Sequence, residues 1–334
     1  MKFHVGYQNN SVFRTYLLEH REKTGEIYFP WEGFTTGRGL VASPEDQATM
    51  EEDLALFARS GIPLCLLLNG NCYGRETLSR DFFNHLGDTV DALGSEYSTL
   101  RCVTTTSPLI AEFIHNNFPS LEVRASVNME IGTVQAVGYM LDYFDSFYLK
   151  REFNYSLSAL KEMYRYCSSH NKKLFILANS GCLNYCSGRT FHDNLVAHQH
   201  ECARMDNGFV FKNFCTKFLE KKENLPELLS LSNFIRPEDV YRYEGLCHGM
   251  KLATRTHCNP LSVAAAYFSG CWNGNVLDLT EPAHSGHLLP QILANNRIAA
   301  SYAERKMTCR KDCMNCTFCR EVFEKALVDL DHEL

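Results

Sequence analysis

The chain has 334 residues, of which 45% are hydrophobic and 22% are charged, and its formal net charge is −6 with a pI near 6.1. This composition supports a sizeable buried core and excludes an intrinsically disordered protein. The acidic balance argues against a strongly basic nucleic-acid-binding surface, while leaving room for a local basic groove. No stretch approaches the roughly 20 apolar residues that cross a bilayer, and the first ten residues do not form a signal peptide.

The 15 cysteines point to a reducing compartment. Without a secretory signal, they are better explained as free thiols or metal ligands than as a disulfide framework. We therefore expect a cytoplasmic protein.

Short apolar runs alternate with helical patterns along most of the chain, which predicts a parallel sheet covered by helices. Nine segments are predicted as strands, at residues 2–7, 25–30, 62–69, 101–106, 122–128, 146–154, 172–179, 233–237 and 250–255. Helices are predicted at 43–61, 108–117, 133–143, 157–168 and 237–245. The first of these has Ser43 as its N-cap and ends at Gly61.

The repeat of strand, crossover and strand at about 25–30 residues favours a TIM-type (β/α)₈ barrel, complete or modified. Eight strands close such a barrel, so one of the nine lies outside it or is overpredicted. An open doubly wound sheet is the alternative. Neither a G-x-G-x-x-G fingerprint nor a Walker A motif supports nucleotide binding.

The predicted domain organisation follows from one long connection and one unusual terminus. Residues 181–231 are too long for an ordinary strand–helix connection and are predicted as a cysteine-rich insertion after the seventh strand. We expect residues 1–300 to form the barrel with this insertion. Residues 301–334 are expected to form a C-terminal segment with four cysteines and an amphipathic helix.

The seventh predicted strand runs directly into a loop that carries soft metal ligands. Cys182 and Cys186 follow the strand, and Cys202 and Cys215 lie further along the same loop. Thiolates select zinc or iron–sulfur clusters, and barrels place their chemistry at the carboxyl ends of strands. The sequence predicts a 4Fe–4S cluster held by Cys182, Cys186, Cys215 and either Cys202 or Cys247. The alternative is that these cysteines pack as small hydrophobic residues.

A second cysteine set lies near the C-terminus, with the spacing C-x3-C-x2-C-x2-C over Cys309, Cys313, Cys316 and Cys319. This spacing resembles ferredoxin-type cluster loops more than the separated pairs of a zinc ribbon. We expect a second metal centre here, a 4Fe–4S cluster or alternatively structural zinc. The first three cysteines also have the radical-SAM spacing, but at the wrong end of the chain for that chemistry.

Histidines and basic residues near the predicted strand ends supply candidate substrate contacts. His192, His198 and His200 lie among the loop cysteines and are either metal ligands or loop-orienting groups. They do not form an H-E-x-x-H motif, and no G-x-S-x-G elbow signals a serine hydrolase.

Basic residues also stand in the sixth strand region and near the last strands. These residues either bind an anionic group or belong to an internal ion-pair network. They are Arg151, Arg236, Lys251 and Arg255. Among all these residues, the predicted substrate contacts are Arg189, His192, Arg151, Lys251 and Arg255.

The segment at residues 234–270 resembles the closing part of the barrel in peptidase family U32, the collagenase-like proteins. Glu238-Asp239-Val240, the strand Lys251-Leu252-Ala253-Thr254-Arg255 and Tyr267 occupy the positions of that family's motifs. The resemblance covers residues 2–270 and implies a modified TIM barrel with cluster cysteines after the strand at 172–179. Several members of the family carry a 4Fe–4S cluster and take part in oxygen-independent hydroxylation, and protease chemistry is established for few.

The cysteine spacing departs from that family. Its loop runs C-x6-C with a later G-x-C-x3-C, whereas this chain has C-x3-C and later cysteines thirteen residues apart. Ala253-Thr254 stands where the family has glutamate and glycine, and the tail cysteines are not part of the family's common core.

The resemblance and the cysteines together predict an iron–sulfur-dependent barrel enzyme. Its expected chemistry is oxygen-independent hydroxylation or a related redox modification of a small molecule, a peptide or RNA. An electron donor or a paired family member is its expected partner. A metal-dependent peptidase and a non-catalytic, metal-stabilised partner protein are the alternatives.

Overall fold

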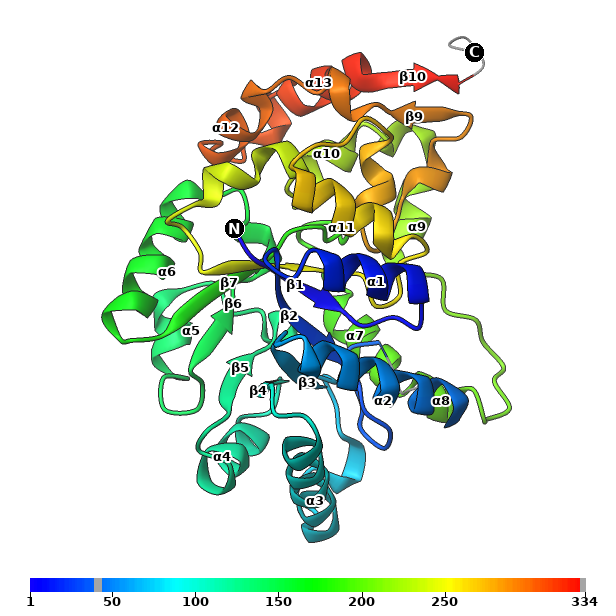
Figure 1. Ribbon diagram of the computed structural model, residues 1–334. Coiled ribbons are helices and arrows are strands. Elements are labelled where there is room, and N and C mark those ends of the chain that lie inside the picture. The colour runs from blue at the N-terminus through cyan, green and yellow to red at the C-terminus, as the bar shows by residue number, and fades with distance from the viewer. Residues whose placement is uncertain (39–43, 331–334) are drawn as a thin grey trace.

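The computed structural model describes residues 1–38 and 44–330, and its main feature is a closed barrel of eight parallel strands (Figure 1). The strands follow chain order around the barrel, and the last pairs with the first. The TIM-type barrel predicted from the sequence is confirmed. Its strands are β1 (Phe3–Gly6), β2 (Thr24–Phe29), β3 (Leu64–Leu68), β4 (Leu100–Thr105), β5 (Glu122–Ala125), β6 (Ser146–Tyr148), β7 (Lys173–Leu177) and β8 (Gly249–Leu252).

Eight of the nine predicted strand segments overlap these strands, and three of the strands begin one residue earlier than predicted. β3, with the sequence LCLLL, is buried at every position, as expected where helices cover a parallel sheet. The predicted strand at 233–237 is wrong. Ile235 makes a backbone hydrogen bond to Ala178, but Pro237 has no N–H for a ladder and begins a 3₁₀ helix, η5 (Pro237–Tyr243).

Helices cover the outside of the barrel between successive strands. They are α1 (Ser11–Glu19), α2 (Pro44–Arg59), α3 (Arg80–Glu96), α4 (Pro108–Asn117), α5 (Val134–Gly138), α6 (Leu157–Ser169) and, after β8, α11 (Pro260–Ser269). α4 matches its prediction because Ser107 caps it by accepting a hydrogen bond from the Ile110 N–H. The predicted N-cap Ser43 lies outside the described residues.

A second hydrophobic cluster lies beside the barrel and joins two distant parts of the chain. The insertion after β7 contains α7 (Arg189–Ala197), α8 (Gln199–Cys202), α9 (Phe214–Leu219) and α10 (Glu227–Leu231), of which α9 and α10 contribute to the cluster. The C-terminal part supplies β9 (Gln291–Leu293), α12 (Ser301–Met307), α13 (Phe318–Ala326) and β10 (Leu327–Asp329). Figure 1 shows α10 beside the orange and red C-terminal elements.

The contacts in this cluster explain the arrangement. Leu228 and Leu229 of α10 pack with Tyr302 of α12 and Phe323 of α13 in one buried set. The apolar side chains of the insertion and of the C-terminal part therefore complete each other's core. This grouping differs from the predicted division at residue 300, because burial joins segments that the sequence separates.

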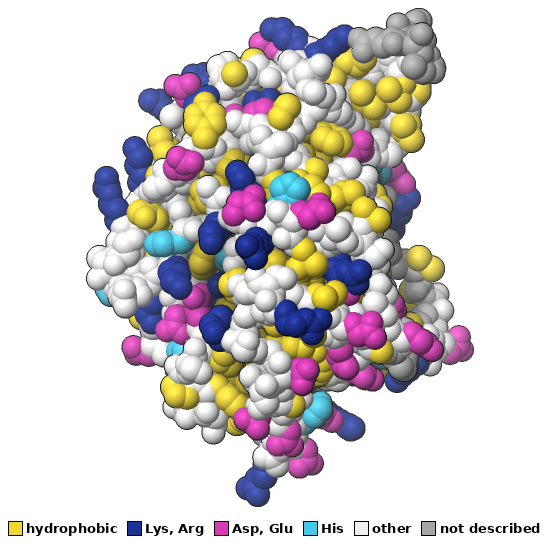
Figure 2. All heavy atoms as spheres, in the orientation of Figure 1, with side chains coloured by type: hydrophobic (Ala, Val, Ile, Leu, Met, Phe, Trp, Pro, Cys, Tyr) yellow, Lys and Arg dark blue, Asp and Glu magenta, His cyan; other side chains and the backbone are white. Residues whose placement is uncertain are grey.

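The outside of the molecule adds two observations. Among the described helices, none is both long and apolar enough to cross a membrane. On the face shown in Figure 2, basic and acidic side chains are interspersed over the middle of the molecule.

Candidate metal centre

The loop after β7 is held in place by a strand-like segment from the C-terminal part of the chain. The Gly181 N–H donates to the Glu281 carbonyl at 2.9 Å, and the Glu281 N–H donates to the Asn179 carbonyl at 2.9 Å. A Cβ atom at Gly181 would lie 1.9 Å from the Pro282 carbonyl oxygen. Only glycine allows this approach, and it positions the next residue, Cys182.

Three of the predicted cluster cysteines line one cavity. Cys182 and Cys186 from the loop meet Cys215 of α9 around a space of about 230 Å³. Burial raises the pKa of Cys215, and the neighbouring thiols of Cys182 and Cys186 raise it further. The fold thus brings together three soft ligands that span 34 positions of sequence from Cys182 to Cys215.

The donor set indicates what this cavity suits. Three thiols are soft ligands, which zinc and iron–sulfur clusters select. A cubane cluster binds each thiolate to a different iron, whereas a zinc ion binds all its thiolates at one centre. The residues that line the cavity therefore fit a 4Fe–4S cluster, and they fit zinc as well.

The two candidates for the fourth thiolate lie elsewhere. Cys202 ends α8 and does not line the cavity. Cys247 precedes β8, so it lies at the amino end of the barrel, whereas Cys182 follows β7 at the carboxyl end. Cys247 donates to the Tyr243 carbonyl, and burial raises its pKa to about 12. The predicted alternative that Cys247 is the fourth ligand is therefore corrected: β7 and β8 run in the same direction, so Cys247 and Cys182 lie at opposite ends of the barrel.

His192 lines the same cavity from α7, together with Asp193. It is half-buried, and burial lowers its pKa, which favours the neutral imidazole that binds metals. The possible metal ligands that line this cavity are therefore three thiols, one imidazole and one carboxylate. His200 is exposed and does not line this cavity.

Arg189 holds the loop rather than projecting freely into the cavity. Its guanidinium donates to Glu130 at 2.6 Å and lies 3.5 Å from Glu152. Glu152 also accepts from the backbone N–H of Tyr185, a residue with φ of 62° just before Cys186. This buried network positions Cys186, so Arg189 is a positioning residue for the cysteine loop.

A basic pocket of about 70 Å³ adjoins the cysteine cavity at the carboxyl ends of the strands. Arg151, Lys251 and Arg255 line it, and all three are predicted substrate contacts. Arg151 donates to Asn128 at 2.7 Å and Arg255 donates to Thr36 at 2.8 Å. Within the described part of the chain, no carboxylate lies at ion-pair distance from any of the three cations.

The charge balance of the basic pocket favours an anionic guest. The acidic residue among those that line it is Glu281, which lies 3.7 Å from Arg38 at the rim. Lys251 is buried with its ammonium group 3.9 Å from the centre of the Tyr28 ring, and burial lowers its pKa to about 8. Burying cations without anions is costly, so an anion that enters the pocket gains their full attraction.

The remaining basic residues near the strand ends are structural. Arg236 is buried, bonds to Asp239 at 2.8 Å and donates to the Ile298 carbonyl. Lys150 lies 3.2 Å from Glu130 and 3.3 Å from Glu152. The sequence offered two explanations for these basic residues. Ion pairing applies to Arg236, whereas Arg151, Lys251 and Arg255 remain available for an anion.

One arrangement that the sequence analysis missed joins two loops at the carboxyl end of the barrel. The Cys72 thiol shares a hydrogen bond with His198, whose Nδ1 lies 2.8 Å from Oε2 of Glu201. The hydrogen bond with His198 lowers the pKa of Cys72, and the same bond raises the pKa of His198. A thiol that is hydrogen-bonded to an imidazole, which is in turn hydrogen-bonded to a carboxylate, favours a reactive thiolate. No local motif connects the two loops.

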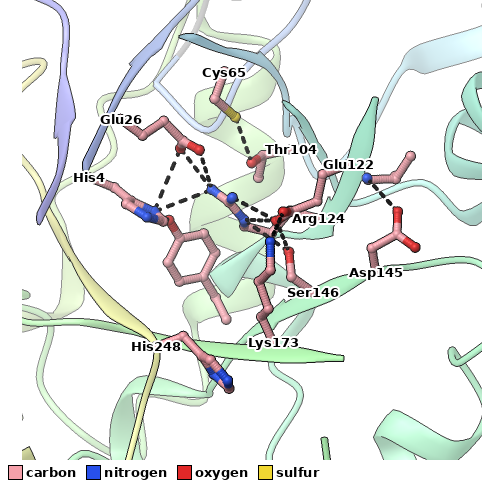
Figure 3. Close-up of polar contacts among 12 residues, drawn as sticks. His4, Glu26, Cys65, Thr104, Glu122, Arg124, Asp145, Ser146, Lys173 and His248 are labelled. Atoms are coloured by element: carbon pink, nitrogen blue, oxygen red, sulfur yellow. Dashed lines mark hydrogen bonds and ion pairs between the residues drawn. The ribbon is translucent and has the colours of Figure 1, made fainter. Parts of the chain in front are cut away.

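Inside the barrel, Arg124 is the centre of a buried ion-pair network (Figure 3). Its guanidinium donates to both carboxylate oxygens of Glu26, at 2.7 and 3.0 Å, and to Glu122 at 2.8 Å. Burial alone would raise the pKa of Glu122, but Arg124 outweighs it and holds that pKa at about 2. Ser146 donates to Glu122, and His4 lies 3.6 Å from Glu26.

The most compact group of metal-ligand side chains in the described part of the chain also lies in this core. The ligand atoms of Glu26, Cys65 and Cys102 are within 4.8 Å of one another. Both oxygens of Glu26 already accept from Arg124, and this guanidinium repels a second cation. We therefore regard the group as part of the barrel core, not as a metal site.

These features define a closed (β/α)₈ barrel with a thiol-lined cavity and a basic pocket side by side at the carboxyl ends of its strands. The chain is 26% identical over 322 residues to the uncharacterized protease MJ1657 of Methanocaldococcus jannaschii, which covers 92% of this chain and 90% of that protein. No protein-family model matches the sequence.

A solved structure shares the barrel. The U32 peptidase Mk0906 superposes with a TM-score of 0.54 over 75% of this chain and 91% of its own, at 15% sequence identity. At this identity the match establishes the fold alone. The shared barrel agrees with the fold that the resemblance to peptidase family U32 implies.

Proposed function

We propose that this chain is an iron–sulfur-dependent barrel enzyme of the U32 type that acts on an anionic substrate. The observation that supports it most is that Cys182 lines both the cysteine cavity and the basic pocket. A group held by the cavity thiols would therefore face a substrate held by the basic side chains. The adjacency of cofactor and substrate sites is what catalysis requires.

Each side of this site has a distinct task. Cys182, Cys186 and Cys215 would hold the cluster, with His192 or Asp193 beside its fourth position. A cluster bound in this way supplies electron transfer or an iron with an exchangeable ligand. Arg151, Lys251 and Arg255 bind and orient the anionic end of the substrate, for which the small pocket is suited.

The reaction class rests on the resemblance to the iron–sulfur members of the family, namely oxygen-independent hydroxylation or a related redox modification. The pocket is too small for more than a terminal carboxylate or phosphate group of a small molecule, peptide or RNA. Such a reaction also requires a one-electron donor, which is the expected partner.

A metal-dependent peptidase is the second candidate, favoured by the names of the relative and of the structural neighbour. That chemistry uses a metal ion to activate water. The residues that line the cavity accept either group, so the preference for a cluster rests on the resemblance to the iron–sulfur members of the family.

Metal analysis of the anaerobically purified full chain tests the proposal. Wild-type protein is expected to contain iron and sulfide and to absorb broadly near about 400 nm. The variant Cys182→Ser/Cys186→Ser should lose about four iron atoms per chain, because two of the three cavity thiolates are removed. The control Cys258→Ser/Cys271→Ser changes two exposed cysteines outside both cysteine sets and should retain all iron.

Two results would contradict the iron–sulfur assignment. The first is unchanged iron and sulfide in Cys182→Ser/Cys186→Ser. The second is zinc without sulfide in the wild type, which would shift the weight to hydrolysis.

The charge state of Lys251 predicts how anion binding depends on pH. Its ammonium group is lost as the pH rises through about 8, so sulfate should bind about tenfold more weakly at pH 9 than at pH 7 if the charged form is required. Sulfate is the chosen probe because its own charge is constant over this range. The measurement is isothermal titration calorimetry.

Two variants give this test its control. Lys251→Met should bind weakly at both pH values and show no change between them. Lys173→Met removes a lysine at the amino end of β7, so it should retain the wild-type profile. A wild-type affinity that does not change from pH 7 to pH 9 would remove Lys251 from the anion site.

A further inference from the structure

The four cysteines of the C-terminal tail line a single cavity of about 920 Å³ between α12 and α13. Cys309, Cys313 and Cys316 are exposed, and Cys319, in α13, is partly buried. We propose that this cavity binds a second iron–sulfur cluster, independent of the one after β7.

The loop backbone is shaped around a thiolate. Lys311 has a φ of 60°, a left-handed conformation that is uncommon for a residue with a side chain. This turn directs its backbone N–H at Sγ of Cys309, at 3.2 Å. Hydrogen bonds from backbone N–H groups to sulfur are typical of the loops that surround cluster sulfurs.

A buried cation beside the cavity is matched by no carboxylate. Lys306 lines the cavity and is 8% exposed. Its ammonium group donates to the carbonyls of Leu229 and Ser232 and contacts the Tyr302 hydroxyl. No ion pair joins Lys306 to a carboxylate among residues 1–38 and 44–330.

The rest of the cavity wall also has more positive than negative side chains. Arg305, Arg310 and Arg320 line it together with Glu227 and Asp312, and Glu227 lies 3.3 Å from Arg320. With Lys306, four cations face two carboxylates. Four thiolates around a [4Fe–4S]²⁺ core carry a net charge of −2, which balances this excess.

The residue spacing favours a cluster over zinc at this site. The order C-x3-C-x2-C-x2-C in one loop resembles ferredoxin-type cluster loops, whereas a zinc ribbon uses two separated pairs. The cavity of about 920 Å³ that the four cysteines line has room for a cluster.

The tail cavity adjoins the loop of the first centre. The Lys311 ammonium group donates to the Glu152 carbonyl at 3.2 Å and lies 5.7 Å from the centre of the Tyr185 ring. Tyr185 is the residue before Cys186. One side chain between Cys309 and Cys313 therefore contacts the loop that carries Cys182 and Cys186.

This adjacency suits the tail cluster to one-electron transfer, a role that rests on the proposed function of the first centre. A reduced protein carrier would give one electron to the exposed tail cluster and become oxidised. The tail cluster would return to its oxidised state when the electron passes to the inner cluster. No bond is formed or broken in either step.

Metal content tests the second cluster without any activity assay. Anaerobically purified wild-type protein should contain about eight iron and eight sulfide and no stoichiometric zinc. The variant Cys313→Ser/Cys316→Ser should retain about four of each, held by the first centre. Two results would overturn the proposal. The first is a wild type that contains one zinc and about four iron. The second is a wild type that contains only four iron, all of which remain in Cys313→Ser/Cys316→Ser and are lost in Cys182→Ser/Cys186→Ser.

The two double variants also separate this proposal from the first one. Loss of iron only in Cys313→Ser/Cys316→Ser supports the tail cluster and contradicts the inner one, and the reverse pattern contradicts the tail cluster. If a variant does not fold, the wild-type iron, sulfide and zinc content still decides whether one or two clusters are present.

Electron paramagnetic resonance tests the adjacency. In dithionite-reduced wild-type protein, two neighbouring paramagnetic clusters should broaden each other's signals, and each double variant should show one simple signal. A wild-type spectrum equal to the sum of the two variant spectra would contradict the proposed electron path.

Discussion

Replacement of Arg124 by methionine is expected to lower the free energy of unfolding by about 3–5 kcal/mol, because it leaves buried carboxylates without their partner. Arg124 is 3% exposed and donates to Glu26 and Glu122 from opposite sides. Methionine has a similar length, so the change removes the charge and hydrogen bonds rather than the volume. Urea denaturation of the variant and the wild type measures the difference.

Two companion variants show whether the loss comes from the stranded carboxylates. Adding Glu26→Gln to Arg124→Met should recover part of the lost stability, because the buried negative charge is removed. Lys173→Met removes a half-exposed partner of Glu122 and should cost less than about 1 kcal/mol. A loss for Arg124→Met as small as that for Lys173→Met would show that the buried network does not stabilise the barrel.

Gly181→Ala is expected to destabilise the protein by about 3 kcal/mol and to abolish iron binding at the first centre. The new Cβ would lie 1.9 Å from the Pro282 carbonyl oxygen and 3.0 Å from its carbon. Both contacts are to backbone, so relief requires that the segment at Glu281 separates from the end of β7. Cys182 would move with Gly181. The measurements are denaturant unfolding and iron content.

Gly208→Ala is the matched control in the same insertion. A Cβ at Gly208 would meet no atom within 4 Å, so stability should change by less than about 0.5 kcal/mol and iron should be retained. An iron-loaded Gly181→Ala variant with wild-type stability would show that the close approach does not position the cysteine loop.

The barrel was predictable because parallel strands covered by helices are buried on both faces. The predicted strands at 62–69 and 172–179 contain the continuous apolar runs LCLLL and LFILA, and the spacing of such runs matches one strand–helix unit. The one wrong strand, at 233–237, has two buried apolar residues, Phe234 and Ile235, but its last residue is Pro237, which has no N–H for a ladder. An apolar run reports burial, and burial alone does not distinguish a strand from a buried connection.

The candidate site was predictable to the extent that its residues follow a strand. Cys182 and Cys186 come directly after β7, and the order of the chain alone indicates that they lie at the carboxyl end of the barrel. The compact tail motif from Cys309 to Cys319 is likewise evident from spacing. In both cases the chemistry is local, because the soft ligands lie within a few residues of one another.

Tertiary structure decided between the alternatives that the sequence left open. Cys215 lines the cavity as predicted, but Cys202 does not line it and Cys247 lies at the opposite end of the barrel. Whether Arg236 or Arg151 is free to bind an anion depends on which carboxylates the fold brings near them.

The sequence by itself therefore determined the barrel and the two cysteine loops, since periodicity and short spacing are local properties. The partners of Arg124, the contact between Cys72 and His198, and the wall shared by the two cavities depend on barrel closure. Closure brings together side chains that are far apart in sequence, and no local pattern encodes which of them will meet.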